Sequence, residues 1–321
     1  MNYASAIVGF SRELEIIMGE RDKESDRPRV LVLGASGLNG GAIVAQLCKM
    51  GGVEVVRGAR DPRTVASWKD EGKAAVRIDL DDPLSFPEAL GGVDRLFLMT
   101  GYTIHMVHQM KTITDAAVDA GVSFIVHLGV FGNGRSTDPH FAWHELVERY
   151  IEGSGVAWCH LHPHVFMENL LTVMRPVGGA LRWPMGDKRV GWIASDDIAA
   201  VAAKVLAEGP ERHAGKNYYL STDLLNGREV AGVLSRATDR PIQALVMTPD
   251  DLALGVASGQ VVMPGNIEAN YAASMLEWVR QTFDGRMAYS AVTTDTVATL
   301  LGRPPIKLEA WARRHRSDLG T

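Results

Sequence analysis

The feature that most constrains this chain is a glycine-rich loop between an apolar run and a helical segment. Residues 30–33 read VLVL, which is typical of a buried strand, and residues 34–40 read GASGLNG. Glycines between a strand and a helix let backbone amides approach a pyrophosphate, and the helix dipole favours its negative charge. Three glycines at these offsets also arise by chance, so the strand and helix around them carry the inference. The loop therefore predicts a nucleotide site, with candidate residues Gly34, Ser36, Gly37, Leu38, Asn39 and Gly40.

Short β-branched runs alternate with amphipathic segments along the first half of the chain. Helices are predicted where apolar residues recur at helical spacing, at residues 41–49, 62–71, 106–120 and 141–152. Strands that alternate with helices through short connections form a parallel sheet with helices on both faces. We therefore expect an α/β fold with a Rossmann, doubly wound parallel sheet. Its predicted strands are residues 30–33, 53–57, 75–78, 95–99, 124–128 and 157–161.

The regular pattern ends after residue 163. Residues 165–172 look helical, whereas residues 175–190 are rich in Gly, Pro and Trp, which is typical of loops. A helix is predicted at 193–206, with Ser195 or Asp196 as its N-cap, and a strand at 218–220. From residue 228 onwards helices dominate.

These patterns divide the chain into three expected parts. Residues 1–27 form an N-terminal extension, with an oligomerisation helix as the alternative reading of its apolar residues. Residues 28–165 form an NAD(P)-binding Rossmann domain. Residues 166–321 form a smaller, mostly helical, substrate-binding lobe, and segments near 190–222 return to the Rossmann sheet.

The composition argues against several classes of protein. Of 321 residues, 46% are hydrophobic and 22% charged, with a formal net charge of -5, and the basic residues are scattered among acidic ones. We therefore expect a folded, soluble protein with no nucleic-acid partner. No apolar run reaches the roughly 18 residues that span a bilayer, and no secretory signal is visible. Together with only two cysteines, this predicts no membrane partner and a cytoplasmic location. A homodimer is an option that the sequence leaves open.

The end of the second predicted strand indicates which nucleotide binds. An NAD-selective site places Asp or Glu there to accept from the ribose hydroxyls, whereas this chain has Arg57 and Arg60. Positive charge suits the 2′-phosphate, so NADP(H) is the expected cofactor and NAD(H) is less favoured. The alternative is a pair of solvated arginines, because Asp61 follows and can pair with one of them.

Histidines form two further patterns. His144 and Glu148 lie four residues apart on one predicted helix, so the carboxylate can set the tautomer of an imidazole that titrates near neutral pH. A helix-surface pair is the alternative. His160, His162 and His164 alternate along a strand and can share one face. We favour a polar cleft for these three over a metal site, and expect no metal.

Several motifs together resemble the NmrA-like branch of the atypical short-chain dehydrogenases/reductases. This branch includes triphenylmethane reductases and bacterial NADPH-dependent quinone oxidoreductases. The motifs are the glycine loop, Asp79-Leu80, AAVDAGV at 116–122, His144 with Glu148, Ser154-Gly155, Pro163, FMENL at 166–170 and DIA at 197–199.

The resemblance implies roles for further residues. Asp79 and Leu80 would lie by the adenine, and Met99, Thr100 and Gly101 would border the nicotinamide at the carboxyl edge of the sheet, where doubly wound folds bind ligands. His144 would be the catalytic residue. The implied substrate-binding residues, in the cleft beside the lobe, are Tyr102, His164, Phe166, Met167 and Asn169.

The chain also departs from the wider family. Related dehydrogenases carry a serine after the fifth strand and a Tyr-x-x-x-Lys pair, but here Gly129 takes the first position and Tyr150 has no lysine four residues later. His144 stands where isoflavone-type reductases carry lysine. The resemblance thus implies an NADPH-dependent reductase of a small conjugated or aromatic acceptor, such as a quinone, an enone or a dye, which tolerates the missing acid. The alternative is an NADP(H)-sensing, NmrA-like regulatory protein without turnover.

Overall fold

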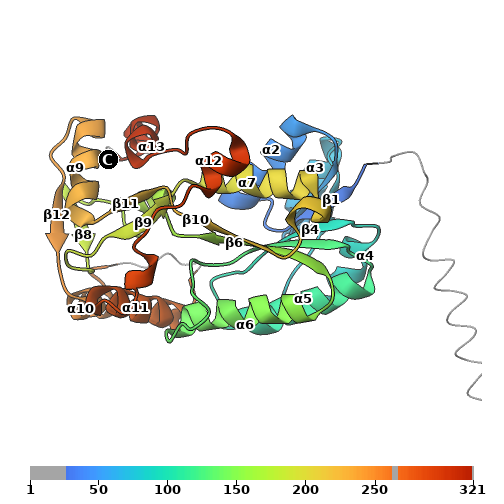
Figure 1. The fold of residues 1–321 in the computed structure, drawn as a ribbon, viewed down its shortest axis with the longest axis horizontal. Helices are drawn as coiled ribbons and strands as arrows, with labels where there is room; N and C mark the ends of the chain where they lie inside the picture. The colour runs from blue at the N-terminus through green and yellow to red at the C-terminus, as the bar shows by residue number, and fades with distance from the viewer. Residues whose placement is uncertain (1–26, 262–266, 320–321) are drawn as a thin grey trace, which may run out of the picture.

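The computed structural model describes residues 27–261 and 267–319, and its centre is a sheet of strand order β10-β6-β5-β4-β1-β2-β3 (Figure 1). Every strand pairing in this sheet is parallel. The order reverses between β1 and β4, which is where doubly wound sheets bind ligands. The predicted Rossmann sheet is confirmed, while the predicted extension lies outside the described residues except for residue 27.

The strands of this sheet agree closely with those predicted. The six predicted before residue 163 are all present, with ends that move by at most two residues. They are β1 (Arg29–Val32), β2 (Glu54–Ala59), β3 (Ala75–Arg77), β4 (Arg95–Met99), β5 (Phe124–Leu128) and β6 (Ala157–Pro163), and the edge strand is β10 (Lys216–Leu220).

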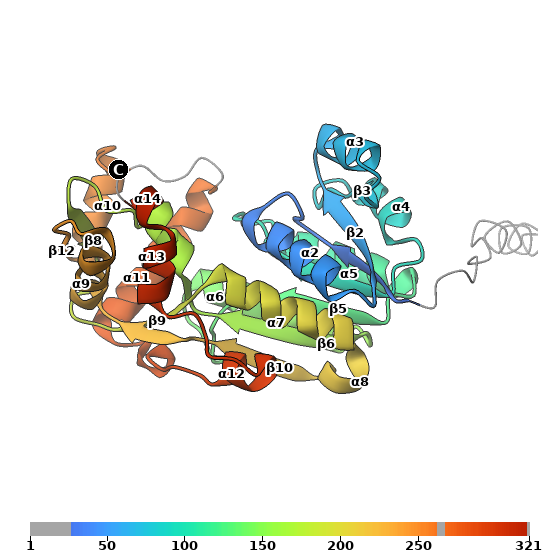
Figure 2. The same ribbon diagram turned by 90° about the horizontal axis from the view of Figure 1, so that it is seen from above.

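Helices cover both faces of the sheet (Figures 1 and 2). One face carries α2 (Leu38–Met50), α7 (Ser195–Glu208) and α12 (Thr296–Leu301), and the other carries α4 (Phe86–Leu90), α5 (Met106–Asp119) and α6 (Pro139–Gly153). Short elements complete this half: α3 (Pro62–Asp70), the 3-10 turn η1 (Pro83–Ser85) and α8 (Pro210–His213). No helix among the described residues has the length and apolarity needed to cross a membrane.

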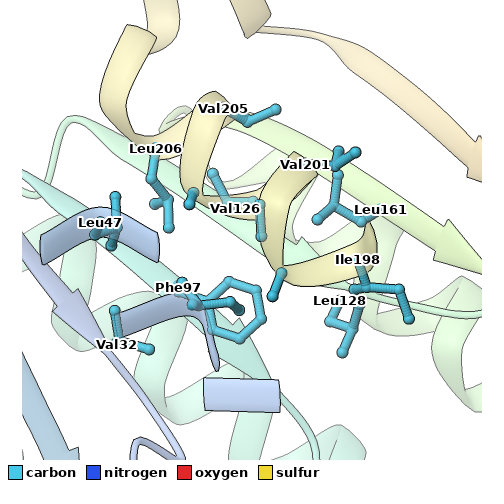
Figure 3. Packing of buried hydrophobic residues seen from close by; sticks show 14 of the residues in the cluster. Val32, Leu47, Phe97, Val126, Leu128, Leu161, Ile198, Val201, Val205 and Leu206 are labelled. Atoms are coloured by element: carbon cyan, nitrogen blue, oxygen red, sulfur yellow. The ribbon is translucent and has the colours of Figure 1, made fainter. Parts of the chain in front are cut away.

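The core beneath α2 and α7 holds the glycine loop in place. Val32 and Phe97 from the sheet pack with Leu47 of α2 and Val201 of α7, and all four are fully buried (Figure 3). Truncating a buried phenylalanine in such a core costs about 3–5 kcal/mol. Because this packing fixes α2 against β1, the first turn of α2 stays at the carboxyl edge of the sheet.

The second half of the chain builds a lobe that follows directly from β6. Its strands form two small sheets, β11-β9-β7 and β12-β8, and helices make up most of the rest. The strands are β7 (Val165–Phe166), β8 (Ala180–Trp183), β9 (Val190–Ile193), β11 (Asp223–Leu225) and β12 (Gln243–Val246). The helices are η2 (Met167–Leu171), α9 (Gly227–Thr238), α10 (Pro249–Ala257), α11 (Ala269–Asp284), η3 (Ala288–Ser290), α13 (Leu308–Arg314) and α14 (Arg316–Leu319).

Three local predictions need correction in this lobe. Residues 165–172, expected to be helical, form a two-residue strand and a 3-10 turn, because β7 pairs with the distant β9. The Gly- and Trp-rich stretch contains β8, which pairs with β12. Of the segment 190–222, α7 and β10 do return to the large sheet, but β9 belongs to the lobe.

The junction between α7 and the lobe depends on one carboxylate. Neither Ser195 nor Asp196 is the N-cap of α7; Ala194 holds that position without a capping side chain. Glu168 of η2 replaces the cap, because it accepts from the Ser195 backbone amide at 3.1 Å and from its hydroxyl at 2.7 Å. Glu168 also accepts from the Trp311 indole of α13 at 2.9 Å. A single charged group therefore joins three separate segments of the chain.

Candidate functional site

The glycine loop connects β1 to the first turn of α2 at the carboxyl edge of the sheet. Gly37 is the N-cap of α2, and no side chain there bonds to the first-turn amides. Gly34, Ser36, Gly37 and Leu38 are all exposed. A helix N-terminus with uncapped amides and a positive dipole end is suited to an anion. The structure therefore presents the predicted phosphate loop in an open form.

Each of the three loop positions is glycine for a different physical reason. Gly34 has φ of +66°, a left-handed conformation that favours glycine. A Cβ on Gly40 would lie 2.3 Å from the Gly34 carbonyl oxygen, so Gly40 is needed for close packing inside the loop. A Cβ on Gly37 would meet only that oxygen, at 3.3 Å. Gly37 alone of the three lacks a strong structural reason to be glycine, which leaves the approach of a ligand as its reason.

Asn39 adds a second sign of a ligand in the first turn of α2. Its side chain is buried, and within the described residues Oδ1 has no hydrogen-bond partner. A buried amide oxygen without a partner costs about 1–3 kcal/mol, so such groups are rare. A polar ligand at the loop would satisfy it directly or through water.

Arg60 is exposed just beyond the end of β2. The alternative in which Asp61 pairs with one of the two arginines is not what the structure shows. Asp61 instead caps α3 by accepting from the Arg63 backbone amide at 3.0 Å, and it pairs with the Arg63 side chain. Arg57 donates to the sulfur of Cys48. Arg60 thus forms no ion pair with an acidic side chain among the residues that the structure describes.

The residues expected around the rest of the nucleotide lie along the same edge. Met99 ends β4, and its sulfur would be 3.0 Å from a Cβ on Gly34, so β4 and the glycine loop are in contact. Thr100 is half-buried and Gly101 exposed. Asp79 and Leu80, after β3, are half-buried, and the Asp79 carboxylate accepts from the Asp81 amide at 3.2 Å.

The five predicted substrate residues fall into two groups. Tyr102 is 47% exposed beyond β4, and Phe166 and Asn169 are half-buried. His164 is buried, its Nε2 donates to the Ser290 carbonyl at 3.0 Å and its Nδ1 accepts from the Val165 amide. Met167 is fully buried in the lobe core. Only the first group is available to a ligand in this structure.

His144 lies on the inner side of α6 and is 4% exposed. The expected pairing with Glu148 does not form; the neighbours of His144 are His140 and His127, with ring centroids 5.4 and 6.2 Å away. Burial holds the pKa of His144 well below its usual value, with the nearby imidazoles as a smaller cause. The expectation of titration near neutral pH is therefore wrong: His144 is neutral at pH 7.

Glu148 faces β6 instead. Its Oε1 lies 3.5 Å from Nδ1 of His162, and a Cβ on Gly129 would be 2.6 Å from the same oxygen. Burial, with Glu152 and Glu145 nearby, raises the pKa of Glu148 to about 8. Gly129 thus makes room for a half-buried carboxyl group that holds its proton at neutral pH.

Two histidines that belong to neither histidine pattern in the sequence, His127 and His140, join this region. His127 of β5 contacts His160 of β6 through their Nδ1 atoms at 3.3 Å, because the parallel register places the two residues side by side. His140 precedes His144 by one turn of α6. His160 and His162 share a face, but His164 lies apart. Among the described residues, no group of three or more His, Cys, Asp or Glu is arranged to hold a metal ion.

Tyr150 has no part in this region. It is on the outer side of α6, where its hydroxyl donates to Asp115 and its ring lies near Lys111. Tyr150 has no lysine four residues later, and its contacts on the outer side of α6 do not place it as an acid.

Comparison with known proteins identifies the family. The model of the NmrA-like family matches residues 26–299. This chain belongs to the NmrA-like family. It is 29% identical to an NAD(P)H azoreductase of Xenophilus azovorans over 91% of this chain and 99% of that protein. The fold matches triphenylmethane reductase of Citrobacter sp. complexed with NADP(H), with a TM-score of 0.75 and 22% identity over 89% of this chain and 99% of the other. NADPH-dependent quinone oxidoreductase of Escherichia coli gives a TM-score of 0.76 and 21% identity, with coverage of 89% and 99%. All three proteins are named as oxidoreductases, the class that the resemblance implied.

Proposed function

We propose that this NmrA-like protein is an NADPH-dependent reductase that transfers hydride to a small conjugated or aromatic acceptor, such as a quinone, an enone or a dye-like molecule. The observation that carries the proposal is the open glycine loop, in which Gly37 leaves the first-turn amides of α2 uncovered. The azoreductase that matches nearly the whole chain supports the same redox chemistry.

The residues present fit a dinucleotide along the carboxyl edge of the sheet. Loop residues 34–40 would hold the pyrophosphate, with the buried Oδ1 of Asn39 gaining a partner. Arg60 would pair with the 2′-phosphate, which is the reason to prefer NADP(H) to NAD(H). Asp79 and Leu80 would lie by the adenine, and residues 99–101 by the nicotinamide. When bound, this cofactor supplies the hydride.

The acceptor would lie between the end of β4 and the lobe. Tyr102, Phe166 and Asn169 are the predicted substrate residues with accessible surface. Quinones, enones and cationic dyes delocalise the charge that arrives with hydride, so positioning and exclusion of water contribute more than a strong acid. His144 would orient the reacting end or pass on a proton as a neutral imidazole, because its lowered pKa leaves little imidazolium.

The test combines cofactor binding with turnover. Purified protein is titrated with NADPH and NADH by fluorescence, and NADPH consumption is followed with a panel of quinones, enals and dyes. Saturable consumption with a matching amount of reduced product is expected. Binding of NADPH without consumption by any acceptor would instead indicate the cofactor-sensing regulator.

A further inference from the structure

A row of five histidines lies between α6 and the sheet. It begins at the end of α6 nearest the lobe and ends at strand β6. His140 and His144 come from α6, His127 from β5, and His160 and His162 from β6. His127 and His160 are fully buried, and His162 is 3% exposed. Packing alone does not explain this composition, because an apolar side chain of similar shape buries no polar nitrogen.

Neighbouring rings in the row lie side by side, and one pair is hydrogen-bonded. The ring centroids from His140 through His144, His127 and His160 to His162 are separated by 5.4, 6.2, 5.3 and 6.1 Å. In the middle, Nδ1 of His127 and Nδ1 of His160 are 3.3 Å apart, so one donates to the other. The other steps show no direct N···N hydrogen bond, so proton transfer across them would need a ring rotation or one bridging water molecule.

The row contains four imidazole nitrogens without a hydrogen-bond partner among the residues that the structure describes. They are Nδ1 of His140, Nδ1 of His144, Nε2 of His127 and Nε2 of His160. Buried polar atoms are almost always paired, so a set of four in one place calls for an explanation. Each belongs to a ring that has another imidazole of the row as its neighbour, which is the arrangement that transient N–H···N bonds require.

One end of the row reaches a polar cavity between α6 and β10. Oε1 of Glu152 lies 3.7 Å from Nε2 of His160, and Oε1 of Glu148 lies 3.5 Å from Nδ1 of His162. The cavity, of about 110 Å³, is lined by both carboxyl groups and also by Asn133, Gly134 and Arg149, which are exposed. It therefore connects the carboxyl groups to water.

The other end of the row reaches the side of the sheet where the acceptor is proposed to bind. The ring of His140 lies 5.0 Å from that of Tyr271, and Tyr271 lies 5.6 Å from Tyr102. Tyr102 is partly exposed just after β4. Burial raises the pKa of Tyr271, so this hydroxyl keeps its proton at neutral pH.

We propose that four of these histidines, in the order His160, His127, His144 and His140, conduct a proton from the Glu148 and Glu152 cavity to the acceptor end of the cleft beside Tyr102. The proposal rests on the proposed reductase function, because reduction of a quinone to a hydroquinone consumes one hydride and one proton. A carboxyl group gives its proton to the first imidazole and takes another from water. Each ring accepts a proton on one nitrogen and releases one from the other. Tyr102 gives its hydroxyl proton to the acceptor oxygen, which forms the O–H bond of the hydroquinone, and regains a proton from His140 through the Tyr271 hydroxyl.

The charge states suit a relay through neutral rings, in which no imidazole has to hold a second proton. Burial is the main cause that lowers the pKa of all five imidazoles. The rings of His140, His144, His127 and His160 are therefore neutral, and each has one donor and one acceptor nitrogen. His162 lies outside the path, because its Nδ1 donates to the Val130 carbonyl at 2.8 Å and its Nε2 lies 2.9 Å from the Asn217 side-chain oxygen. Glu148 holds its proton up to about pH 8 because burial, Glu152 and Glu145 outweigh the opposing charge of Arg149. The other polar groups around this cavity are His162 of β6 and Asn217 and Tyr219 of β10. A proton source therefore faces a chain of neutral carriers.

The activity test compares an acceptor that needs a proton with one that does not. A quinone needs hydride and a proton, whereas a triphenylmethane dye cation becomes neutral on accepting hydride alone. His127→Phe breaks the middle of the row, and His127→Leu serves if the larger ring prevents folding. Loss of proton transfer should lower quinone turnover by about 10² or more, the lower range for a positioned acid-base group, and leave dye turnover unchanged.

The control is His213→Phe. His213 is also buried, but it binds the Tyr218 hydroxyl and Glu208, outside the row. It should affect the two acceptors equally. Equal loss for both acceptors in His127→Phe would overturn the proton path while the reductase function stands. Wild-type protein that reduces neither acceptor would overturn the proposed function and the path with it.

A second readout needs neither cofactor nor turnover. In protein labelled with ¹⁵N-histidine, a connected row predicts that His144 resonances respond to the ionisation of Glu148, although the two side chains do not pair. The response should vanish at His144 in both Glu148→Gln and His127→Phe, and persist at His162 in the latter. If the His144 resonances of the wild-type protein do not change as Glu148 ionises, the proposal is contradicted.

Discussion

Gly37→Val separates cofactor binding from folding within the glycine loop. Gly37 has φ of -94° and ψ of 177°, an extended conformation that valine adopts readily. Its Cβ would meet a single atom within 4 Å, the Gly34 oxygen at 3.3 Å. Loss of glycine at an N-cap costs about 1 kcal/mol or less. For a chain of this size that is a decrease of about 1–2 °C in Tm.

The same substitution should remove most of the affinity for NADPH. A branched side chain at Gly37 would cover the first-turn amides of α2, and loss of about two charge-assisted hydrogen bonds costs about 3–6 kcal/mol. This corresponds to an increase of about 10² to 10⁴-fold in Kd.

Fluorescence titration with NADPH and a thermal melt on the same sample measure both effects. Gly40→Val is the matched control, because its Cβ would lie 2.3 Å from the Gly34 oxygen and the variant should lose stability as well as binding. A stable Gly37→Val protein with wild-type NADPH affinity would refute the assignment of the loop.

Three further predictions follow from the charges of the site. Arg60→Ala should weaken NADPH binding by about 1.5–3 kcal/mol and leave NADH binding unchanged. Equal losses for the two nucleotides would show that Arg60 does not contact the 2′-phosphate. His144→Phe should lower kcat/KM for a quinone by about 10² to 10⁴-fold with little change in NADPH affinity. If the wild-type pH profile of kcat/KM has an inflection near pH 6–7 that the variant lacks, the lowered pKa of His144 is contradicted. The raised pKa of Glu148 means that the folded state holds a proton that the unfolded state releases, so stability falls as the pH rises from about 4.5 to about 8. Glu148→Gln should flatten that dependence in urea unfolding, and an unchanged slope would show that Glu148 is ionised in the folded protein.

The parallel sheet was predictable because its signals are local. Each strand in the first half is a short apolar run, and each helix between strands shows its own periodicity, so β4 and β5 have the bounds that the sequence predicts. The lobe was less predictable because its strands pair with segments far along the chain, as β8 does with β12. Local periodicity contains no information about such partners.

The site divides in the same way. The glycine loop and Arg60 were recognisable because a nucleotide site on this fold has a known position in the chain. The histidine row was not, since it depends on the register of β5 with β6 and on which side of α6 faces the sheet. Helical spacing suggested that Glu148 would pair with His144, but Gly129 leaves room for its carboxyl group on the other side.

The central claim is that this protein transfers hydride from NADPH to an organic acceptor, and isotope transfer tests it most directly. The enzyme is given NADPH that carries deuterium at C4 of the nicotinamide, on each face in turn, together with a quinone or a triphenylmethane dye. With the dye, the account predicts that deuterium from one face alone appears on the central carbon of the product, and with both acceptors NADPH oxidation shows an isotope effect for that face. NADPH that binds at the glycine loop but passes no deuterium to the dye would contradict the account.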